Sequence, residues 1–134
     1  MKKAIFLSVT ILAIATVLTI SSCTKTAETF NFIGAWTVSS YSLNGADQTT
    51  AYKALYVNYR IDFDASKNYI ETYTQSGVNV SNAGPWVLIN NGSDLQLTKS
   101  SDNSVRVLHI ISLNGTAADL TESNGTKEYH WLKN

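Results

Sequence analysis

The single cysteine is the side chain best placed for covalent chemistry. Cys23 closes an apolar run, Ala4 to Ile20, that follows Lys2 and Lys3. Basic residues, an apolar segment and then small residues are the layout of a secretory signal. A membrane span needs about 20 predominantly apolar residues, and this run is shorter and contains hydroxyl side chains. With no second cysteine there is no intrachain disulfide, so we expect an exported domain to depend on its core for stability.

The four residues Ile20-Ser21-Ser22-Cys23 resemble the lipobox of bacterial lipoproteins. The resemblance implies that the chain is cut before the cysteine and that a diacylglyceryl group is attached to its sulfur. Labelling with palmitate would detect this lipid. Two or more acyl chains anchor a protein stably, at roughly 0.8 kcal/mol per buried CH₂. An uncleaved helical anchor and ordinary secretion with a free thiol are the alternatives.

This interpretation divides the chain into three parts. Residues 1–22 are a lipoprotein signal peptide, residues 23–32 a lipid-anchored flexible tether, and residues 33–134 a single β domain. The tether carries no acidic cluster, which favours a protein on the outer membrane facing the periplasm, with the cell surface as the other possibility. The predicted partner is therefore the membrane, bound through Cys23, while any protein partner is unspecified.

The two histidines do not form a recognisable site. His109 lies in an apolar segment and His130 lies between Tyr129 and Trp131, and neither has a second ligand at a metal-like spacing. We interpret both as hydrogen-bonded histidines of a β domain and predict no metal and no cofactor. The many serines leave Ser-His-Asp catalysis open on residue types alone, but the sequence has no nucleophile-elbow pattern such as G-x-S-x-G, and no catalytic residue is assigned.

One group of carboxylates has the spacing for acid–base work. Asp62 and Asp64 are two residues apart, which puts them on one face of a strand, and Glu71 could lie across a hairpin from them. Arg60 shares the face of the two aspartates. A solvated strand face is the better interpretation.

Composition excludes one large class of partner. Removing Lys2 and Lys3 with the leader leaves eight basic residues against ten acidic ones, a net charge of −2. Such a surface has no excess positive charge with which to hold nucleic acid phosphates.

Alternating apolar and polar residues predict an all-β domain of short strands joined by turns. Residues 57–64 alternate most clearly, residues 104–113 are apolar on both faces as in a well-covered strand, and residues 76–85 are predicted to be a loop. A short helical turn capped by Thr49 or Thr50 is expected over residues 49–56. The eight predicted strands span residues 35–43, 57–64, 69–75, 86–90, 94–99, 104–113, 118–123 and 126–132. An antiparallel meander of this size closes into a barrel or folds into a two-sheet sandwich.

Two short motifs narrow this choice. Gly34-Ala35-Trp36 resembles the G-x-W of lipocalins, and Gly84-Pro85-Trp86 is similar to a pattern in bacterial lipocalin-like lipoproteins. The resemblance implies an eight-stranded antiparallel up-and-down barrel, with Gly34 and Trp36 as structural residues that close one end and an open end that can take a small apolar ligand. The chain is shorter than true lipocalins and lacks a clear long C-terminal helix.

Three functions follow for a barrel of this kind. The first is a lipid-anchored envelope protein that binds a small apolar or amphipathic molecule; the second is a non-enzymatic interaction or structural protein whose barrel is filled by side chains. An enzyme is the third and is not favoured. The residues expected to line a cavity, if there is one, are Val38, Tyr59, Ile61, Phe63, Trp86 and Leu88.

Overall fold

The computed structural model describes residues 31–122 and 124–134. Cys23, the signal peptide and nearly all of the tether lie outside these residues, so the predictions made for them stay predictions. The described elements are β1 (Gly34–Leu43), β2 (Ala46–Asp47), α2 (Thr49–Leu55), β3 (Val57–Phe63), β4 (Asn68–Gln75), β5 (Val78–Ile89), the short 3-10 helix η1 (Asn90–Gly92), β6 (Asp94–Thr98), β7 (Val105–Leu113), β8 (Ala117–Glu122) and β9 (Lys127–Lys133).

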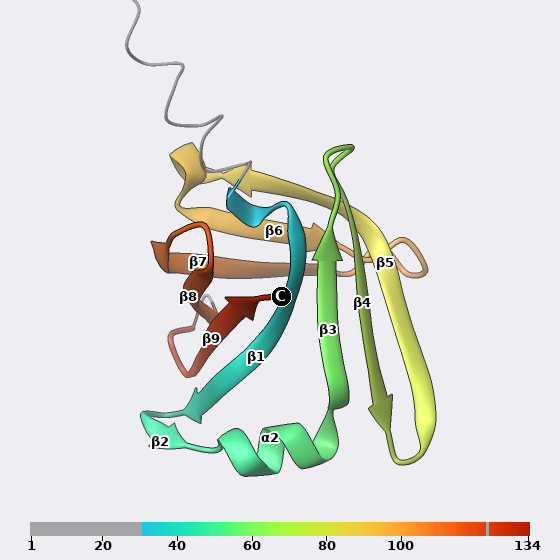
Figure 1. Ribbon diagram of the computed structural model, residues 1–134. Coiled ribbons are helices and arrows are strands. Elements are labelled where there is room, and N and C mark those ends of the chain that lie inside the picture. Colours follow the sequence, from blue (N-terminus) through green and yellow to red (C-terminus); the bar gives the residue numbers. More distant parts are fainter. Residues whose placement is uncertain (1–30, 123) are drawn as a thin grey trace, which may run out of the picture.

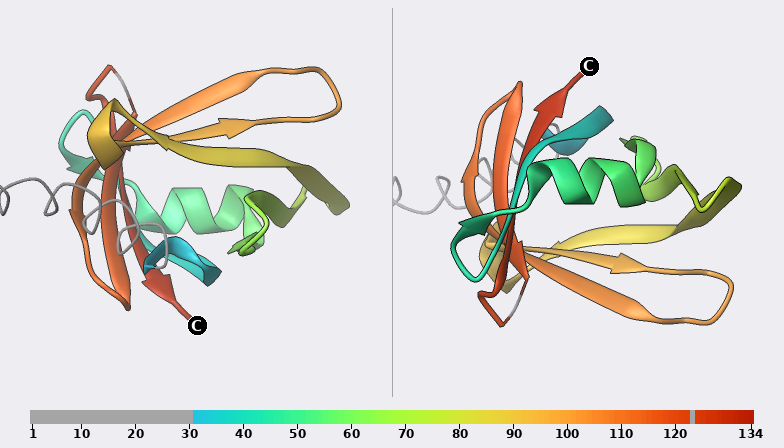
Figure 2. Two further views of the ribbon diagram at one scale, coloured as in Figure 1. Left: turned by 90° about the horizontal axis from the view of Figure 1, so that it is seen from above. Right: turned by 90° about the horizontal axis from the view of Figure 1, so that it is seen from below.

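The strands form one antiparallel sheet that closes on itself (Figures 1 and 2). Each long strand pairs with the next in the chain, and β9 returns to pair with β1, while β2 is only a two-residue addition to the end of β1. Eight strands therefore make the barrel wall, as predicted, and the two-sheet sandwich is wrong. Closure leaves no long edge of unpaired backbone groups at the seam between the first and last strands.

The alternation of β3 sets one face toward the interior. Tyr59, Ile61 and Phe63 are buried, while Arg60 is exposed, Asp62 is half-buried, and an ion pair of 2.7 Å joins these two. A strand with one dry and one wet face has only one register that buries its apolar residues. The predicted solvated face is confirmed for this arginine and its aspartate.

The region predicted to be a loop is mostly strand. β5 begins at Val78 rather than at residue 86, and it pairs with β4 over eight consecutive positions. Ser76 and Gly77 form the whole connection, and both have positive φ, as a two-residue hairpin turn requires. The interspersed Asn and Ser residues hid the alternation, and pairing with the neighbouring strand outweighed their low β propensity.

The glycine of the Gly84-Pro85-Trp86 motif is required by a close approach between strands. A Cβ at Gly84 would overlap the carbonyl oxygen of Thr98 and lie 3.0 Å from the backbone nitrogen of Ser100. Only a residue without a side chain lets the end of β6 pass so near to β5.

Helix α2 fills the connection between β1 and β3 and lies at one end of the barrel, which we call the helical end (Figure 1). The predicted threonine cap is wrong, because Gln48 precedes the helix and no side chain caps it. The Thr49 hydroxyl instead donates to Asp47 at 2.6 Å and accepts the backbone N–H of Tyr41 at 2.9 Å. These two bonds fasten the start of the helix to the rim of the barrel.

The opposite end of the barrel is filled by aromatic rings. The Trp36 indole N–H donates to the carbonyl oxygen of Phe32 at 2.7 Å, and the Lys133 ammonium lies 5.4 Å from the Trp36 ring centroid. Gly34 has a φ of +124°, and a Cβ there would meet the Lys133 side chain at 2.6 Å. This floor, made by residues with less than 3% exposure, consists of Phe32, Trp36, Phe63, Trp86 and Trp131.

Candidate functional site: the helical end of the barrel

Six tyrosines gather where α2 meets the barrel. Tyr52 of α2 is the centre of the group, with ring centroids 4.7 Å from Tyr41 and Tyr56, 6.0 Å from Tyr59 and 6.1 Å from Tyr129. Tyr56 directly follows the last residue of the helix, and its ring packs against that of Tyr52. The tyrosine cluster consists of Tyr41, Tyr52, Tyr56, Tyr59, Tyr73 and Tyr129.

A buried ion pair lies beneath the tyrosine cluster. Glu71 of β4 is 9% exposed, and its carboxylate accepts bonds from the Tyr59 hydroxyl at 2.7 Å, the Asn82 amide at 3.1 Å and the Arg106 guanidinium at 3.1 Å. Arg106 comes from β7, three strands away in the sheet, so the ion pair crosses the barrel interior. Its guanidinium also lies 5.3 Å from the Tyr129 ring centroid.

The sequence offered Glu71 as a neighbour of Asp62 and Asp64, and that placement is wrong. Glu71 pairs in register with Ile61, whereas Asp62 pairs with Ile70. Because successive side chains of a strand alternate between faces, the carboxylate enters the interior and the two aspartates stay outside. The three acids therefore do not form one group.

The surroundings keep the buried tyrosine hydroxyls protonated. Burial raises the pKa of Tyr52, Tyr59 and Tyr129 well above the ordinary value, and the positive charge of Arg106 only partly opposes this shift. Loss of a phenol proton would place a second negative charge close to Glu71. At neutral pH these hydroxyls act as neutral hydrogen-bond donors and acceptors.

A pocket of about 230 Å³ opens beside α2 at this end. Four members of the tyrosine cluster line it, and apolar side chains and one amine complete it. The lining residues are Tyr41, Leu43, Gln48, Ala51, Tyr52, Leu55, Tyr56, Lys127 and Tyr129. Leu43 and Leu55 are partly exposed at the rim, and Lys127 pairs with Glu122 at 3.1 Å.

The six residues that the sequence placed in a possible cavity are all less than 9% exposed: Val38, Tyr59, Ile61, Phe63, Trp86 and Leu88. They belong to one cluster of sixteen buried apolar residues, and none of them lines the pocket beside α2. The cavity thus remains a prediction, while the pocket is lined by residues the sequence did not single out. The four-residue spacing of Tyr52 and Tyr56 was the only available signal.

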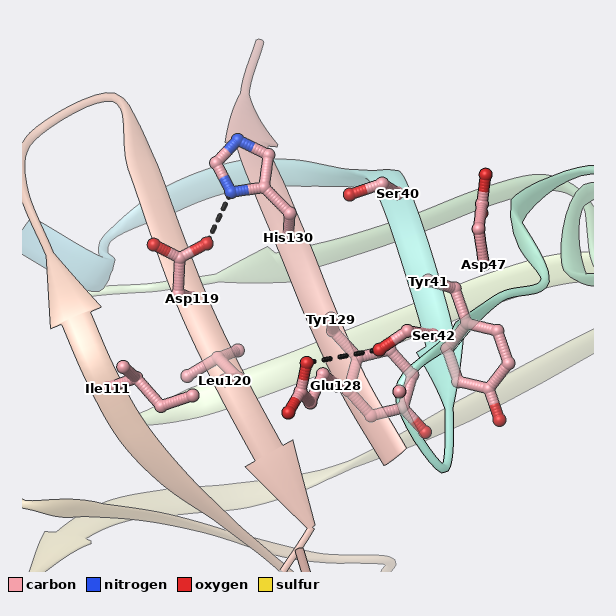
Figure 3. Close-up of a pocket in the computed structure, with 11 residues that line it drawn as sticks. Ser40, Tyr41, Ser42, Asp47, Ile111, Asp119, Leu120, Glu128, Tyr129 and His130 are labelled. Atoms are coloured by element: carbon pink, nitrogen blue, oxygen red, sulfur yellow. Dashed lines mark hydrogen bonds and ion pairs between the residues drawn. The ribbon is translucent and has the colours of Figure 1, made fainter. Parts of the chain in front are cut away.

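A second hollow, of about 600 Å³, lies against β1, β8 and β9 (Figure 3). Its polar groups are largely bonded to one another: His130 Nδ1 bonds to Asp119, and the Ser42 hydroxyl donates to Glu128 at 3.1 Å. Asp119 also accepts the Ser112 hydroxyl. These two bonds lower the pKa of the Asp119 carboxyl.

Ser40, His130 and Asp119 are cross-strand neighbours in this hollow, in the order nucleophile, base and acid. Acyl transfer needs a hydrogen bond from the serine hydroxyl to the imidazole. The described residues contain the His130–Asp119 bond but no bond between Ser40 and His130. In the described residues the row is a hydrogen-bond network on the barrel surface.

The other histidine also lies on the outside of the barrel. His109 Nδ1 is 2.8 Å from Asp94, and its side chain is 52% exposed. Within residues 31–122 and 124–134, no group of three or more His, Cys, Asp or Glu side chains could hold a metal ion. In the same ranges, no helix has the length and apolar character to cross a membrane.

An eight-stranded antiparallel barrel closed between its first and last strands, with a tryptophan near the start of β1 in its floor, defines the class of lipocalin-like barrels. The model of the lipocalin-like domain family matches residues 32–117, and the chain belongs to that family. This is generally a family of non-catalytic binding proteins.

Solved structures share this fold at low sequence identity. A lipocalin-like protein from Bacteroides uniformis is 12% identical, with a TM-score of 0.61, and the match covers 78% of this chain and 99% of that one. A duf4847 family protein from Bacteroides vulgatus is 10% identical, with a TM-score of 0.54, and the match covers 78% and 94% of the two chains. No curated protein matches the sequence.

Proposed function

We propose that this protein is a lipid-anchored lipoprotein of the bacterial cell envelope whose barrel binds a small amphipathic molecule at its helical end. Cys23 carries the lipid, and the barrel faces the periplasm from the outer membrane. The leader sequence supports the anchor, and the barrel family supports binding.

The pocket beside α2 is the observation that carries the binding proposal. Ligand sites combine a concave, mostly apolar or aromatic lining with a few placed polar groups, and this pocket has tyrosine rings, leucines and one lysine. Its volume of about 230 Å³ lies below the common range of roughly 300–1,000 Å³. Binding of a larger molecule therefore needs α2 to move outward, and none of the helix's residues is buried.

The filled floor favours a second candidate. Five aromatic side chains close the interior around Trp36, so the barrel can also serve as a rigid scaffold for contacts with an envelope protein. This candidate makes the pocket beside α2 a feature of packing and predicts no retained small molecule.

Two measurements test the proposal. Labelling with radioactive palmitate should mark the wild-type protein but not the Cys23→Ser variant, and an unlabelled wild-type band would remove the anchor. Native mass spectrometry of the full chain, released from detergent micelles, should show a retained molecule of constant mass. A spectrum of unliganded protein alone, repeated after incubation with envelope lipid extract, would favour the scaffold.

A further inference from the structure

Beneath the helical end, Glu71 and Arg106 form an ion pair whose two members differ in how many of their hydrogen-bonding groups have partners. The Glu71 carboxylate accepts three hydrogen bonds, from Tyr59, Asn82 and Arg106. A guanidinium has five N–H donors in a fixed fork. Only one of the five donates to a residue of the part of the chain that the structure describes. Both oxygens of the acid thus have partners, while four of the five donors of the base have none among the described residues.

These spare donors lie beside the pocket. Arg106 does not itself line the pocket but packs over the ring of Tyr129, which does, and its positive charge opposes the rise that burial causes in the pKa of Tyr52, another lining residue. The Arg106 side chain is 31% exposed, compared with 11% for Glu71. The arginine side chain is therefore the member of the pair that solvent, or a ligand in place of solvent, reaches more readily.

Both oxygens of the second carboxylate near the pocket, Glu122, also have partners, since its Oε2 lies 3.1 Å from the Lys127 ammonium. Glu122 Oε1 accepts the Tyr129 hydroxyl at 3.0 Å and the Lys127 ammonium at 3.2 Å. Lys127 itself lines the pocket, and its side chain is 40% exposed. Both cations near the pocket thus have donors left over, and both carboxylates have their oxygens occupied.

We infer that the ligand of this site carries an anionic, acceptor-only head group of the carboxylate type, held by Arg106 with help from Lys127. This inference rests on the proposed binding function and names the class of its ligand. Arg106 is then the residue that determines specificity, because charge-assisted hydrogen bonds to a planar carboxylate are roughly twice as strong as neutral ones. The tyrosine rings and the rim leucines take the apolar part.

The arrangement of charges disfavours a ligand with a cationic head group. An ammonium group brings donors and positive charge to a site where the nearest carboxylates are already bonded to cations. It would have to displace Arg106 from Glu71 or Lys127 from Glu122. The order of affinity among chains of equal length should therefore be carboxylate, then alcohol, then ammonium.

The test compares three probes of one chain length: octanoate, octan-1-ol and octylammonium. Binding is measured by titration calorimetry on the full chain in phosphatidylcholine nanodiscs, with the heat from empty nanodiscs subtracted. Wild-type protein should bind octanoate at least tenfold more tightly than octylammonium. In the Arg106→Gln/Glu71→Gln variant, which leaves no unpaired charge, this preference should fall at least fivefold while octan-1-ol binding stays within twofold.

Matched controls separate the specificity from the fold. Glu71→Gln alone removes the competing acid and should leave octanoate binding equal or tighter, and Arg60→Gln, which removes an arginine from the outer face, should change none of the three affinities. Near-ultraviolet circular dichroism verifies that each variant is folded. If Arg106→Gln/Glu71→Gln is unfolded, Arg106→Lys provides the comparison, with a loss of octanoate affinity expected because a lysine lacks the forked geometry.

Two results would overturn the inference in different ways. Equal affinity for the three probes, or a preference for octylammonium, would refute the anionic head group and leave the binding function intact. No binding of any probe by wild-type protein would refute the head-group inference together with the proposed site.

Discussion

Replacing the members of the interior ion pair tests whether it forms as described. At 3.1 Å and an effective dielectric constant of about 20, the attraction between Glu71 and Arg106 is roughly 5 kcal/mol. Desolvation offsets much of it, and breaking a fully buried pair costs about 3–5 kcal/mol. Because the Arg106 side chain is 31% exposed, we expect Arg106→Gln to lower the free energy of unfolding by about 2 kcal/mol.

The two single variants should differ, because one partner is more deeply buried than the other. Arg106→Gln leaves the Glu71 side chain, 11% exposed, with Tyr59 and Asn82 as its remaining partners among the described residues. Glu71→Gln leaves a guanidinium that solvent reaches, so we expect a loss of about 1 kcal/mol. The double variant has no stranded charge and should also lose about 1 kcal/mol, which gives a coupling energy of about 2 kcal/mol.

Urea unfolding of the four proteins, followed by circular dichroism, supplies this double-mutant cycle. Arg60→Gln is the matched control, because its ion pair with Asp62 lies on the outer face and an exposed pair contributes little to stability. If the two single losses simply add in the double variant to within about 0.5 kcal/mol, the pair does not interact in solution and the interior arrangement described above is refuted.

Three further changes have clear expected outcomes. Gly84→Ala forces a methyl group into the β6 backbone and should lower the free energy of unfolding by about 3 kcal/mol, whereas Gly115→Ala, which meets nothing within 4 Å, should stay within about 0.5 kcal/mol in urea unfolding; equal losses would contradict the close approach. Trp36→Phe removes the indole donor and leaves a void in the floor, so thermal unfolding should show that the free energy of unfolding falls by about 2 kcal/mol. An unchanged Tm would contradict the role of Trp36 in closing this end of the barrel. The hydrogen bonds that lower the pKa of Asp119 stabilise the fold above the unfolded value of about 3.9 and lose their effect as the pH falls through the lower folded value. Asp119→Asn should therefore be less stable than wild type at pH 7, and the gap should close below pH about 4 in urea titrations; a gap independent of pH would be inconsistent with this pKa shift.

The residue pattern alone was sufficient to predict an antiparallel all-β domain, whereas the choice of a barrel over a sandwich came from the resemblance of Gly34-Ala35-Trp36 to the lipocalin motif. Period-two alternation and turn residues such as Asn124-Gly125 predicted eight antiparallel strands, because a barrel strand must show one apolar face to its core. The weakest stretch was residues 76–85, where polar residues occupy both faces and only pairing with β4 shows that a strand is present. The expectation that residues 104–113 are covered on both sides was also wrong, since Val105 and Ile111 are 56% and 58% exposed.

The candidate site could not be predicted from the sequence, because the residues that form it are far apart in the chain. Glu71 and Arg106 are 35 residues apart and meet only when three intervening strand pairings place β4 opposite β7. Likewise, Tyr52 joins Tyr129 only because α2 folds over the end of the barrel. The sequence by itself determined the all-β class of the domain and the direction in which most strand residues face, since these depend on local periodicity. Closure of the sheet decided which inward-facing polar groups meet, because that depends on register and stagger around the whole barrel.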